Sequence, residues 1–248
     1  MAQNNYLVEM KDIYKWFSGV CALNGVDFNV GYAEIVGLLG DNGAGKSTLI
    51  KILSGYHPPD SGKIFFEGKE QHFSSPREVR SLGIETIYQE AAMVHKMSIM
   101  RNIFMGRERG KVDMGFAKYL DIEQMERESM EALEDVNLRL RSPHAIVDEL
   151  SGGQRQGVAI ARAMYFKSKL VILDEPTNNL SVKESEKVLN FIKELKNQGI
   201  SSIFISHNLY HVYPVVDRVV ILSHGEKVGD FQKEETSLEE VTELMVKP

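Results

Sequence analysis

The chain has 248 residues, of which 43% are hydrophobic and 26% are charged, and its formal net charge is −6. This length allows one large domain or two smaller ones. The acidic charge argues against nucleic-acid binding, because affinity for duplexes comes largely from Lys and Arg that neutralise phosphates. No apolar run reaches the ~18 residues that cross a bilayer, and the N-terminus lacks a signal-peptide core, so we expect a cytosolic protein.

The number of cysteines limits which disulfide and metal sites the chain can contain. Cys21 is the single cysteine, which excludes an internal disulfide and any multi-cysteine zinc site. We expect it to be a small buried or half-buried apolar residue.

The chain begins with segments that alternate between apolar and polar residues. This pattern predicts half-buried antiparallel strands at Tyr6–Lys15 and Val26–Val30. Trp16 and Phe17 are expected in the loop that follows the first strand, where their rings can cap the small sheet.

The stretch GDNGAGKST separates an apolar run, Ile35–Leu39, from a helix-competent run, Lys46–Leu53. The apolar run is typical of a strand covered on both faces. The glycines let successive backbone N–H groups point inward, and the helix N-terminus adds partial positive charge. This context predicts a phosphate-binding loop, with Lys46 on the β- and γ-phosphates and Ser47 as a Mg²⁺ ligand. The candidate ligands of the phosphates are Gly40, Asp41, Asn42, Gly43, Ala44, Gly45, Lys46, Ser47 and Thr48.

A bound nucleotide also needs a surface for its base. The flat apolar faces of Trp16 and Phe17 precede the phosphate loop, and stacking on adenine requires only such a face. We favour Phe17 for this role, while capping of the small sheet stays an alternative.

The middle of the chain changes from strands to helices. Short strands are expected at Lys63–Phe66 and Ile84–Tyr88. Charge rises from Met93 to Glu149, and apolar residues recur at helical spacing, which indicates a helical insertion. The recurring residues are Ile122, Met125, Ser129 and Leu133. The insertion closes at Leu150–Gln154, where a long helix begins.

The last part of the chain returns to alternating strands and helices. Strands are expected at Leu170–Leu173, Ser202–Ile205, Val219–Leu222 and Lys227–Asp230, with helices from about Val182 and near the C-terminus. Strands that alternate with helices imply a mostly parallel sheet with helices on both faces. The fold class is therefore α/β.

Polar residues stand at the ends of three apolar strands. Asp174 and Glu175 follow one strand, Gln89 a second and His207 a third. Strand ends of one parallel sheet converge where ligands bind, so we expect these side chains to meet. Asp174 and Gln89 are candidate Mg²⁺ ligands, and Glu175 is the candidate base that activates water. Gln89 can also hold the attacking water, and His207 can donate to a phosphate oxygen and support Glu175.

A second anion site is expected at the start of the helix after the insertion. Ser151 is a helix N-cap residue, and Gly152 and Gly153 bare the backbone at that helix end. Together with Gln154 they can contact phosphate, but one chain cannot fold this site onto its own phosphate loop if the insertion projects away. We therefore expect two chains, each of which completes the site of the other.

In these motifs the chain resembles an ATP-binding cassette (ABC) ATPase. The resemblance identifies GDNGAGKS as Walker A, Gln89 as the Q-loop, LSGGQ as the signature, LVILDE as Walker B and His207 as the switch histidine. It implies a P-loop NTPase with a mostly parallel central sheet, a small N-terminal antiparallel β subdomain and an inserted α-helical subdomain. Residues 1–248 would form one ABC ATPase domain: a RecA-like core with the antiparallel subdomain at 1–92 and 165–248, and the helical signature subdomain at about 93–164.

The family resemblance also implies ligands and partners. ATP with Mg²⁺ would lie between the Walker loop of one subunit and Ser151, Gly152, Gly153 and Gln154 of another, most simply in a homodimer. Three segments resemble cassettes of bacterial simple-sugar importers of the ribose, galactose and xylose type: SPREVRSLGIETIYQE, RNIFMGRE and PTNNLSVKE. The implied partners are membrane permease subunits and, indirectly, an extracytoplasmic sugar-binding protein, with the chain peripheral on the inner face of the membrane.

Two alternatives stay open at this point. A soluble cassette ATPase that acts on ribosomes or DNA would share the motifs, although the acidic charge argues against it. The apolar residues after Gln89 are either core of the insertion or an adaptable groove for a permease helix. They are Met93, Val94, Met97, Ile99 and Met100.

Overall fold

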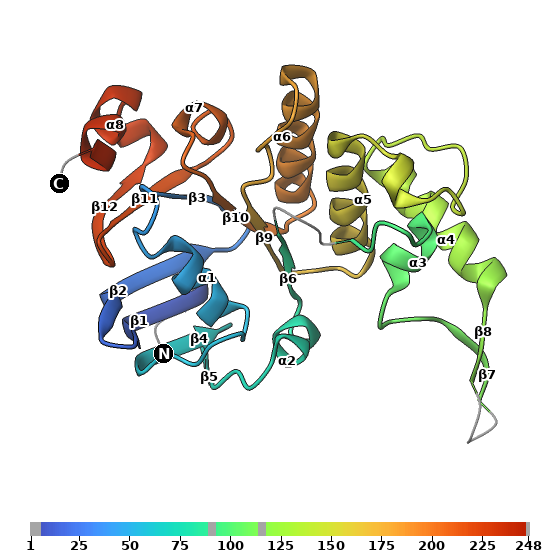
Figure 1. Cartoon of the computed structure of the whole chain (residues 1–248), viewed down its shortest axis with the longest axis horizontal. Coiled ribbons are helices and arrows are strands. Elements are labelled where there is room, and N and C mark those ends of the chain that lie inside the picture. The colour runs from blue at the N-terminus through green and yellow to red at the C-terminus, as the bar shows by residue number, and fades with distance from the viewer. Residues whose placement is uncertain (1–5, 89–92, 114–117, 247–248) are drawn as a thin grey trace. The chain divides into compact units, whose positions relative to one another are not determined.

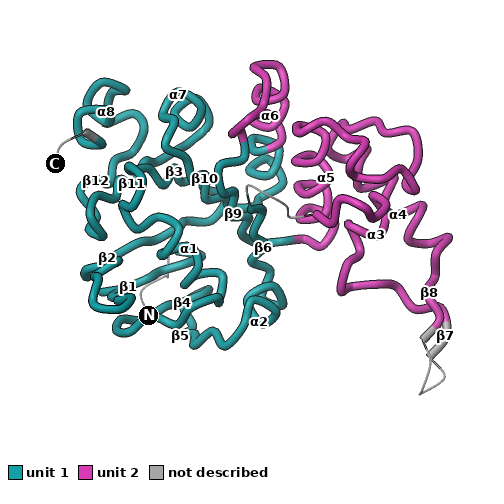
Figure 2. Tube along the Cα trace, in the orientation of Figure 1, with its two compact units in different colours: residues 1–88, 168–176, 192–248 teal, residues 89–167, 177–191 magenta. Residues whose placement is uncertain are grey.

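The computed structural model describes residues 6–88, 93–113 and 118–246. The chain divides into two compact units (Figure 2). Unit 1 comprises residues 1–88, 168–176 and 192–248, and unit 2 comprises residues 89–167 and 177–191. Unit 2 thus takes in residues 177–191, which the sequence-based division leaves with the core. No helix in the described part of the chain is long and apolar enough to span a membrane.

A four-stranded antiparallel sheet opens unit 1, in the order β2-β1-β4-β5 (Figure 1). Its strands are β1 Tyr6–Phe17, β2 Val20–Gly31, β4 Ser61–Phe66 and β5 Lys69–Gln71. The expected loop at Trp16 and Phe17 is wrong, because these residues pair with Cys21 and Val20 inside the β1–β2 hairpin. Ser18 and Gly19 make the turn with positive φ, the conformation that a two-residue hairpin requires. Cys21 is exposed, contrary to expectation.

A six-stranded sheet forms the centre of unit 1, in the order β12-β11-β3-β10-β9-β6. All neighbours in it are parallel except β11 and β12. The strands are β3 Ile35–Leu39, β6 Ile84–Ile87, β9 Leu170–Asp174, β10 Ser201–Ile205, β11 Arg218–Ser223 and β12 Glu226–Gln232. The parallel sheet predicted from alternating strands and helices is confirmed.

Helices cover the central sheet on both faces. The helices of unit 1 are α1 Lys46–Leu53, α2 Pro76–Ser81, α7 Leu209–Val212 and α8 Leu238–Val246, with a short 3₁₀ helix at Lys233–Glu235. Helix α1 lies between the two sheets (Figure 1), and its apolar residues join one core with both of them. On the other face, a Cβ at Gly37 of β3 would lie 2.7 Å from Val212 of α7. Strand β3 is thus buried from both sides, which holds the loop after it in place.

Unit 2 is mainly helical. Its elements are α3 Ile99–Phe104, β7 Gly110–Asp113, β8 Lys118–Leu120, α4 Ile122–Asp135, a 3₁₀ helix at Val147–Glu149, α5 Gly152–Tyr165 and the first part of α6 Val182–Asn197. The two short strands β7 and β8, which pair antiparallel, are an addition that the expected helical insertion did not include. Met125, Ser129 and Leu133 face the core of the unit as their spacing predicts, but Ile122 is exposed, because it starts the first turn of α4.

Candidate functional site: a nucleotide site on unit 1 and a helix end on unit 2

The loop Gly40–Thr48 joins β3 to α1, as predicted. Gly40, Gly43 and Gly45 have positive φ. A Cβ at Gly40 would lie 2.2 Å from the Leu222 carbonyl oxygen, so that position requires glycine, whereas a Cβ at Gly43 would meet nothing within 4 Å. The loop therefore packs tightly at its base and is open at its tip.

The α1 N-terminus is left uncapped. Its N-cap residue is Gly45, with no side-chain hydrogen bond. The first N–H groups of an α-helix have no partner within the helix, so they are available to an anion here. Ser47 is exposed on this turn, while Ala44 is buried. Asp41, Asn42 and Gly43 lie on the exposed tip of the loop, and Thr48 is half-buried on α1.

Lys46 lies with its ammonium inside the loop. Nζ donates to the carbonyl oxygens of Gly40 at 2.7 Å and Asp41 at 2.9 Å, and the residue is 8% exposed. Burial lowers the pKa of Lys46, and the charges of Glu175, Asp41 and Asp174 oppose this shift. Among the described residues, the hydrogen bonds of this buried ammonium go to backbone carbonyls, which leaves its charge well placed to bind an anion.

Asp174 and Glu175 end β9 beside β10. Asp174 pairs with Ile205 in the sheet. Burial and the adjacent Glu175 raise the pKa of Asp174, and Lys46 and Lys51 act in the other direction. These two carboxylates and Lys46 thus meet at one edge of the sheet, as the order of the strands predicts.

Glu175 is held by the residues that follow β10. Its backbone φ is 49°, and its N–H donates to the Ile205 carbonyl oxygen at 3.0 Å. Its Oε1 accepts the His207 N–H at 3.0 Å and lies 2.7 Å from His207 Nδ1. Its Oε2 accepts the Ser206 hydroxyl at 2.9 Å. The carboxylate is therefore fixed at both oxygens.

Ser206 is a site residue that sequence reasoning missed. It stands between β10 and His207, and its hydroxyl also accepts the Asn208 N–H at 3.0 Å. The signal available in the sequence was a hydroxyl residue directly before the polar residue that follows the strand.

The structure gives less direct support to two of the residues proposed from the sequence, Gln89 and Phe17. Gln89 lies outside the described residues. Phe17 is 41% exposed, its ring makes an edge contact with His57, and Lys15 Nζ lies 5.6 Å from its centroid. Trp16 instead stacks on Tyr14, with ring centroids 5.4 Å apart. Of the two rings, Phe17 is thus the one that no stacked partner covers in the described structure.

The oxygen ligands at this edge fit a Mg²⁺ ion that arrives with a nucleotide. Among the described residues, no cluster of three or more His, Cys, Asp or Glu side chains can hold a metal. The Ser47 hydroxyl and the Asp174 carboxylate are hard oxygen ligands, and Mg²⁺ in phosphate sites takes few protein ligands beside the phosphates and water. A divalent cation would also offset the electrostatic cost of burying the Asp174 carboxylate beside that of Glu175.

On unit 2, α5 begins at Gly152 with a complete capping box. The Ser151 hydroxyl accepts the Gln154 N–H at 3.3 Å, and Gln154 Oε1 accepts the Ser151 N–H at 2.9 Å. Segment 177–191 packs against this helix end. A Cβ at Gly152 would lie 2.4 Å from Leu180 Cδ2, and one at Gly153 would lie 3.0 Å from Glu184 Cβ. The two glycines therefore allow close packing within this unit.

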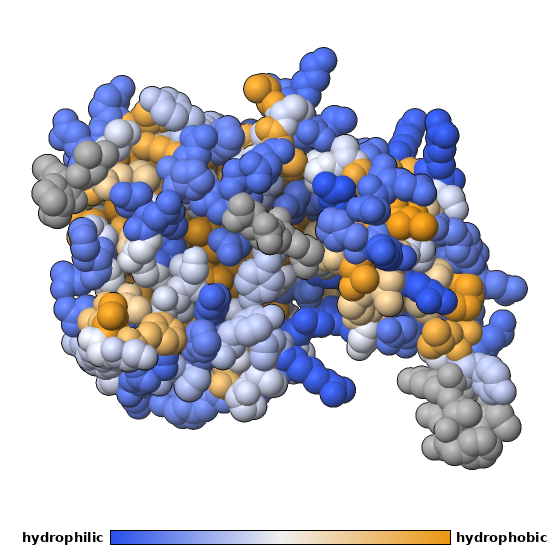
Figure 3. Space-filling view, viewed as in Figure 1, coloured by the Kyte–Doolittle hydropathy of each residue, from blue (hydrophilic) through white to orange (hydrophobic). Residues whose placement is uncertain are grey.

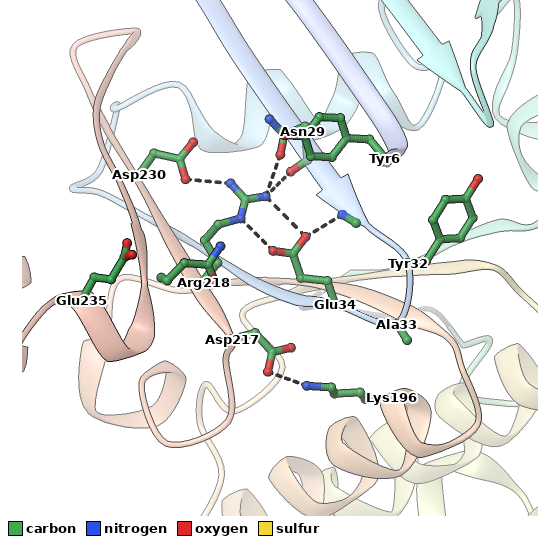
Figure 4. A pocket seen from close by; sticks show the side chains of 12 residues that line it. Tyr6, Asn29, Tyr32, Ala33, Glu34, Lys196, Asp217, Arg218, Asp230 and Glu235 are labelled. Atoms are coloured by element: carbon green, nitrogen blue, oxygen red, sulfur yellow. Dashed lines mark hydrogen bonds and ion pairs between the residues drawn. The ribbon is translucent and has the colours of Figure 1, made fainter. Parts of the chain in front are cut away.

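Unit 1 also has a polar recess of about 670 Å³ away from these strand ends. Figure 4 shows the Arg218 guanidinium at its centre, enclosed by acceptors. It donates to Glu34 and Asp230 at 2.7 Å each, and to the Asn29 side chain at 2.9 Å. This network joins β11 and β12 to β2 and the β2–β3 turn and pairs each guanidinium nitrogen with an acceptor, so we assign it to the fold.

Comparison with known proteins agrees with this geometry. The profile of the ABC transporter family matches residues 23–178. The chain is 47% identical to the xylose/arabinose import ATP-binding protein XylG of Sulfolobus acidocaldarius, over 96% of this chain and 93% of that protein. It is 44% identical to the fructose import ATP-binding protein FrcA of Rhizobium meliloti, over 92% and 88% respectively. It also matches the ribose import ATP-binding protein RbsA of Hahella chejuensis at 38% identity, but spans only 47% of that longer chain.

Solved structures give the same result for the fold. A nucleotide-free ATP-binding cassette from an ABC transporter superposes with a TM-score of 0.82 at 26% identity, covering 98% of this chain and 96% of the other. The ADP conformation of an ATP-binding cassette of an ABC transporter matches with the same TM-score and coverage. With the phosphate loop, the strand-end carboxylates and LSGGQ in place, the chain belongs to the ABC transporter family.

Proposed function

We propose that this chain is the ATP-binding and ATP-hydrolysing subunit of an ABC importer for a simple sugar. The observation that carries the proposal is the convergence of Lys46, Asp174, Glu175 and His207 at the ends of β3, β9 and β10. The sugar names of three relatives support the cargo class. The identity of the sugar depends on the permease and its binding protein, not on this subunit.

Each residue of the unit 1 site has a role in this proposal. The N–H groups of Gly40–Thr48 and the Lys46 ammonium bind the phosphates of ATP, and Phe17 stacks on adenine. Ser47, Asp174 and Gln89 hold Mg²⁺, which supplies positive charge that stabilises the phosphates and the leaving group.

Hydrolysis depends on Glu175. The oxygen of a water molecule attacks the γ-phosphorus, the bond to the β–γ bridging oxygen breaks, and Glu175 accepts a water proton. Ser206 and His207 hold both carboxylate oxygens, which aims the base before ATP arrives. His207 then donates to a γ-phosphate oxygen.

The second half of each site comes from another subunit. Ser151, Gly152, Gly153 and Gln154 of one chain contact the γ-phosphate held by the loop of its partner, most simply in a homodimer. ATP binding closes the pair and hydrolysis opens it, and this cycle drives the permease. Residues at about 93–164 act as the signature subdomain that takes part in this movement.

An apolar surface on unit 2 is the proposed contact with a permease helix. Val94 and Met97 are 42% and 38% exposed, whereas Met93, Ile99 and Met100 are buried. The five residues considered together in the sequence thus divide into a surface pair and a core group. Exposed hydrophobic residues lie over the region of α3 and α4 (Figure 3). A patch of this kind can contact the apolar face of a helix. The subunit would thereby sit peripherally on the cytoplasmic face of the membrane.

The test of this surface is a transport assay. Met97→Asp should abolish sugar uptake by the assembled transporter, because a charge would be buried against the permease helix. ATP turnover by the isolated subunit should be retained. Unchanged uptake would contradict the assignment of this surface.

The test of the catalytic proposal is Glu175→Gln. The amide cannot accept the proton, so we expect ATP turnover to fall ~10²–10⁴-fold. The variant should bind ATP and accumulate as a dimer in gel filtration with ATP and Mg²⁺. Glu226→Gln, at the start of β12, makes the same charge change and should hydrolyse ATP normally. Normal turnover in Glu175→Gln would remove the base role.

A further inference from the structure

The N-terminus of α5 already has a carboxylate beside it. Glu184 lies in the first turn of α6, and both segments belong to unit 2. Its Oε1 lies 3.5 Å from the Gly153 nitrogen, which donates to it. Its Oε2 accepts the Ser181 N–H at 3.1 Å and the Ser181 hydroxyl at 2.8 Å. One carboxylate thus bridges the starts of two helices.

The Ser151 hydroxyl takes part in the same contact. Its hydrogen bond to Glu184 is the largest cause that lowers the pKa of this carboxyl to about 2, followed by the bonds from Ser181. A serine hydroxyl has a single proton to donate. The proton that would bind a phosphate oxygen is therefore already donated to Glu184.

The backbone next to this contact is shaped to receive the Glu184 side chain. A Cβ at Gly153 would lie 3.0 Å from Glu184 Cβ and 3.2 Å from its Cγ. The glycine lets the side chain of Glu184 lie flat against the helix end, and the carboxylate then reaches the Gly153 N–H and Ser151. The N-terminus of α5 carries a partial positive charge, which favours an anion at this position.

We infer that Glu184 is an internal competitor for phosphate at the signature helix, occupying its anion position until ATP held by a second subunit displaces it. The inference rests on the proposed function, since it assigns a regulator to the same site. In the free subunit, the carboxylate satisfies the Gly153 N–H and the Ser151 hydroxyl. A γ-phosphate must either replace it or lie beside a like charge. Glu184 therefore sets the ATP concentration at which two subunits close.

The experiment measures ATP-dependent dimerisation in the Glu175→Gln background, where hydrolysis does not interfere. The test chain carries Glu184→Gln in addition, and the matched control carries Glu186→Gln, which removes the same charge two residues along α6 from an exposed position. Light scattering follows dimer formation during titration with ATP and Mg²⁺. We expect half-maximal dimerisation at ~2- to 5-fold lower ATP in the Glu184→Gln chain, the range that one charge at a helix N-terminus produces.

The outcomes separate the two proposals. An unchanged or raised ATP requirement in the Glu184→Gln chain would overturn the competitor role, since it would make Glu184 neutral or helpful. If the Glu175→Gln background does not dimerise at saturating ATP, the proposed function itself fails. If circular dichroism shows that Glu184→Gln is not folded at the assay temperature, Glu184→Asp replaces it. Its shorter side chain withdraws from Gly153 and should also lower the ATP requirement.

Discussion

Two glycine-containing helix starts in this chain have opposite arrangements. Helix α1 begins after the phosphate loop without any side-chain cap, and its loop tip is open. Helix α5 begins with a capping box and has Glu184 against its second residue. At α1 the glycine at the loop tip, Gly43, has open space around it, whereas the two glycines at the start of α5 allow close packing. The same residue type and the same helix end can thus be prepared for a ligand or satisfied internally.

This difference has an energetic consequence. At α1, buried charge and unpartnered N–H groups cost stability and favour ligand binding. At α5, the polar groups are paired within unit 2 and stabilise the fold. Substitutions at the open site should therefore reduce binding without reducing stability, and substitutions at the closed one should reduce stability.

The largest expected effect is on ATP binding by Lys46→Ala. Loss of a charged hydrogen-bond donor to phosphate should weaken binding by ~10- to 100-fold, which corresponds to about 1.5–3 kcal/mol. Isothermal titration calorimetry measures this directly. Lys51→Ala, on the last turn of the same helix, removes the same charge from an exposed position and is the control. Equal affinities in the two variants would mean that the loop backbone alone binds the phosphates.

The next effect concerns Ser206, which positions Glu175. Ser206→Ala removes one hydrogen bond to the carboxylate, so kcat should fall by about 5- to 30-fold, in line with ~1–2 kcal/mol for such a bond. KM for ATP should stay unchanged, because Ser206 does not touch the phosphates in the proposed site. Ser206→Thr keeps the hydroxyl and should restore most of kcat. A matching fall in both variants would indicate a packing role instead.

Asp174→Asn should stabilise the nucleotide-free protein while abolishing hydrolysis. Burial raises the pKa of Asp174, so its charged form costs stability at every pH above that raised value. The neutral amide removes this cost, and we expect the melting temperature to rise by roughly 2–4 °C at pH 7, the shift that ~1 kcal/mol produces at this size.

The sign of the effect can be checked by pH. The advantage of Asp174→Asn should shrink as pH falls toward ~3.9, the pKa of an unfolded Asp, and should vanish below it, where the wild-type carboxyl is protonated in both states. A melting temperature below that of the wild type at pH 7 would show that Asp174 stabilises the fold, which would weaken the contrast between the open nucleotide site and the closed start of α5.

At the closed helix start, Ser151→Ala should destabilise the protein. Loss of an N-cap costs about 1 kcal/mol, so the melting temperature should fall by roughly 2–4 °C. Ser151→Thr retains the capping hydroxyl and should recover most of the loss. If the alanine variant melts like the wild type, the cap contributes nothing and α5 is held by its packing.

Sequence reasoning predicted the parts of the site that depend on local chemistry and strand order. The phosphate loop required only a strand, a glycine-rich turn and a helix, and the meeting of Asp174, Glu175 and His207 followed from parallel strands that end at one edge. It was less successful where pairing extends beyond a local pattern. Trp16 and Phe17 were placed in a loop because the strand appeared to end at Lys15, whereas the hairpin pairs both.

By itself, the sequence determined the α/β fold, the order of the motifs and the chemical identity of the residues at each strand end, because these depend on periodicity and on chain order. Only the tertiary structure decided which other side chains form hydrogen bonds with these functional residues. The Ser206 hydroxyl on Glu175 and the Glu184 carboxylate on α5 join positions that lie 31 residues apart in each case. Such contacts depend on how elements pack in three dimensions, where no local pattern along the chain specifies which side chains meet.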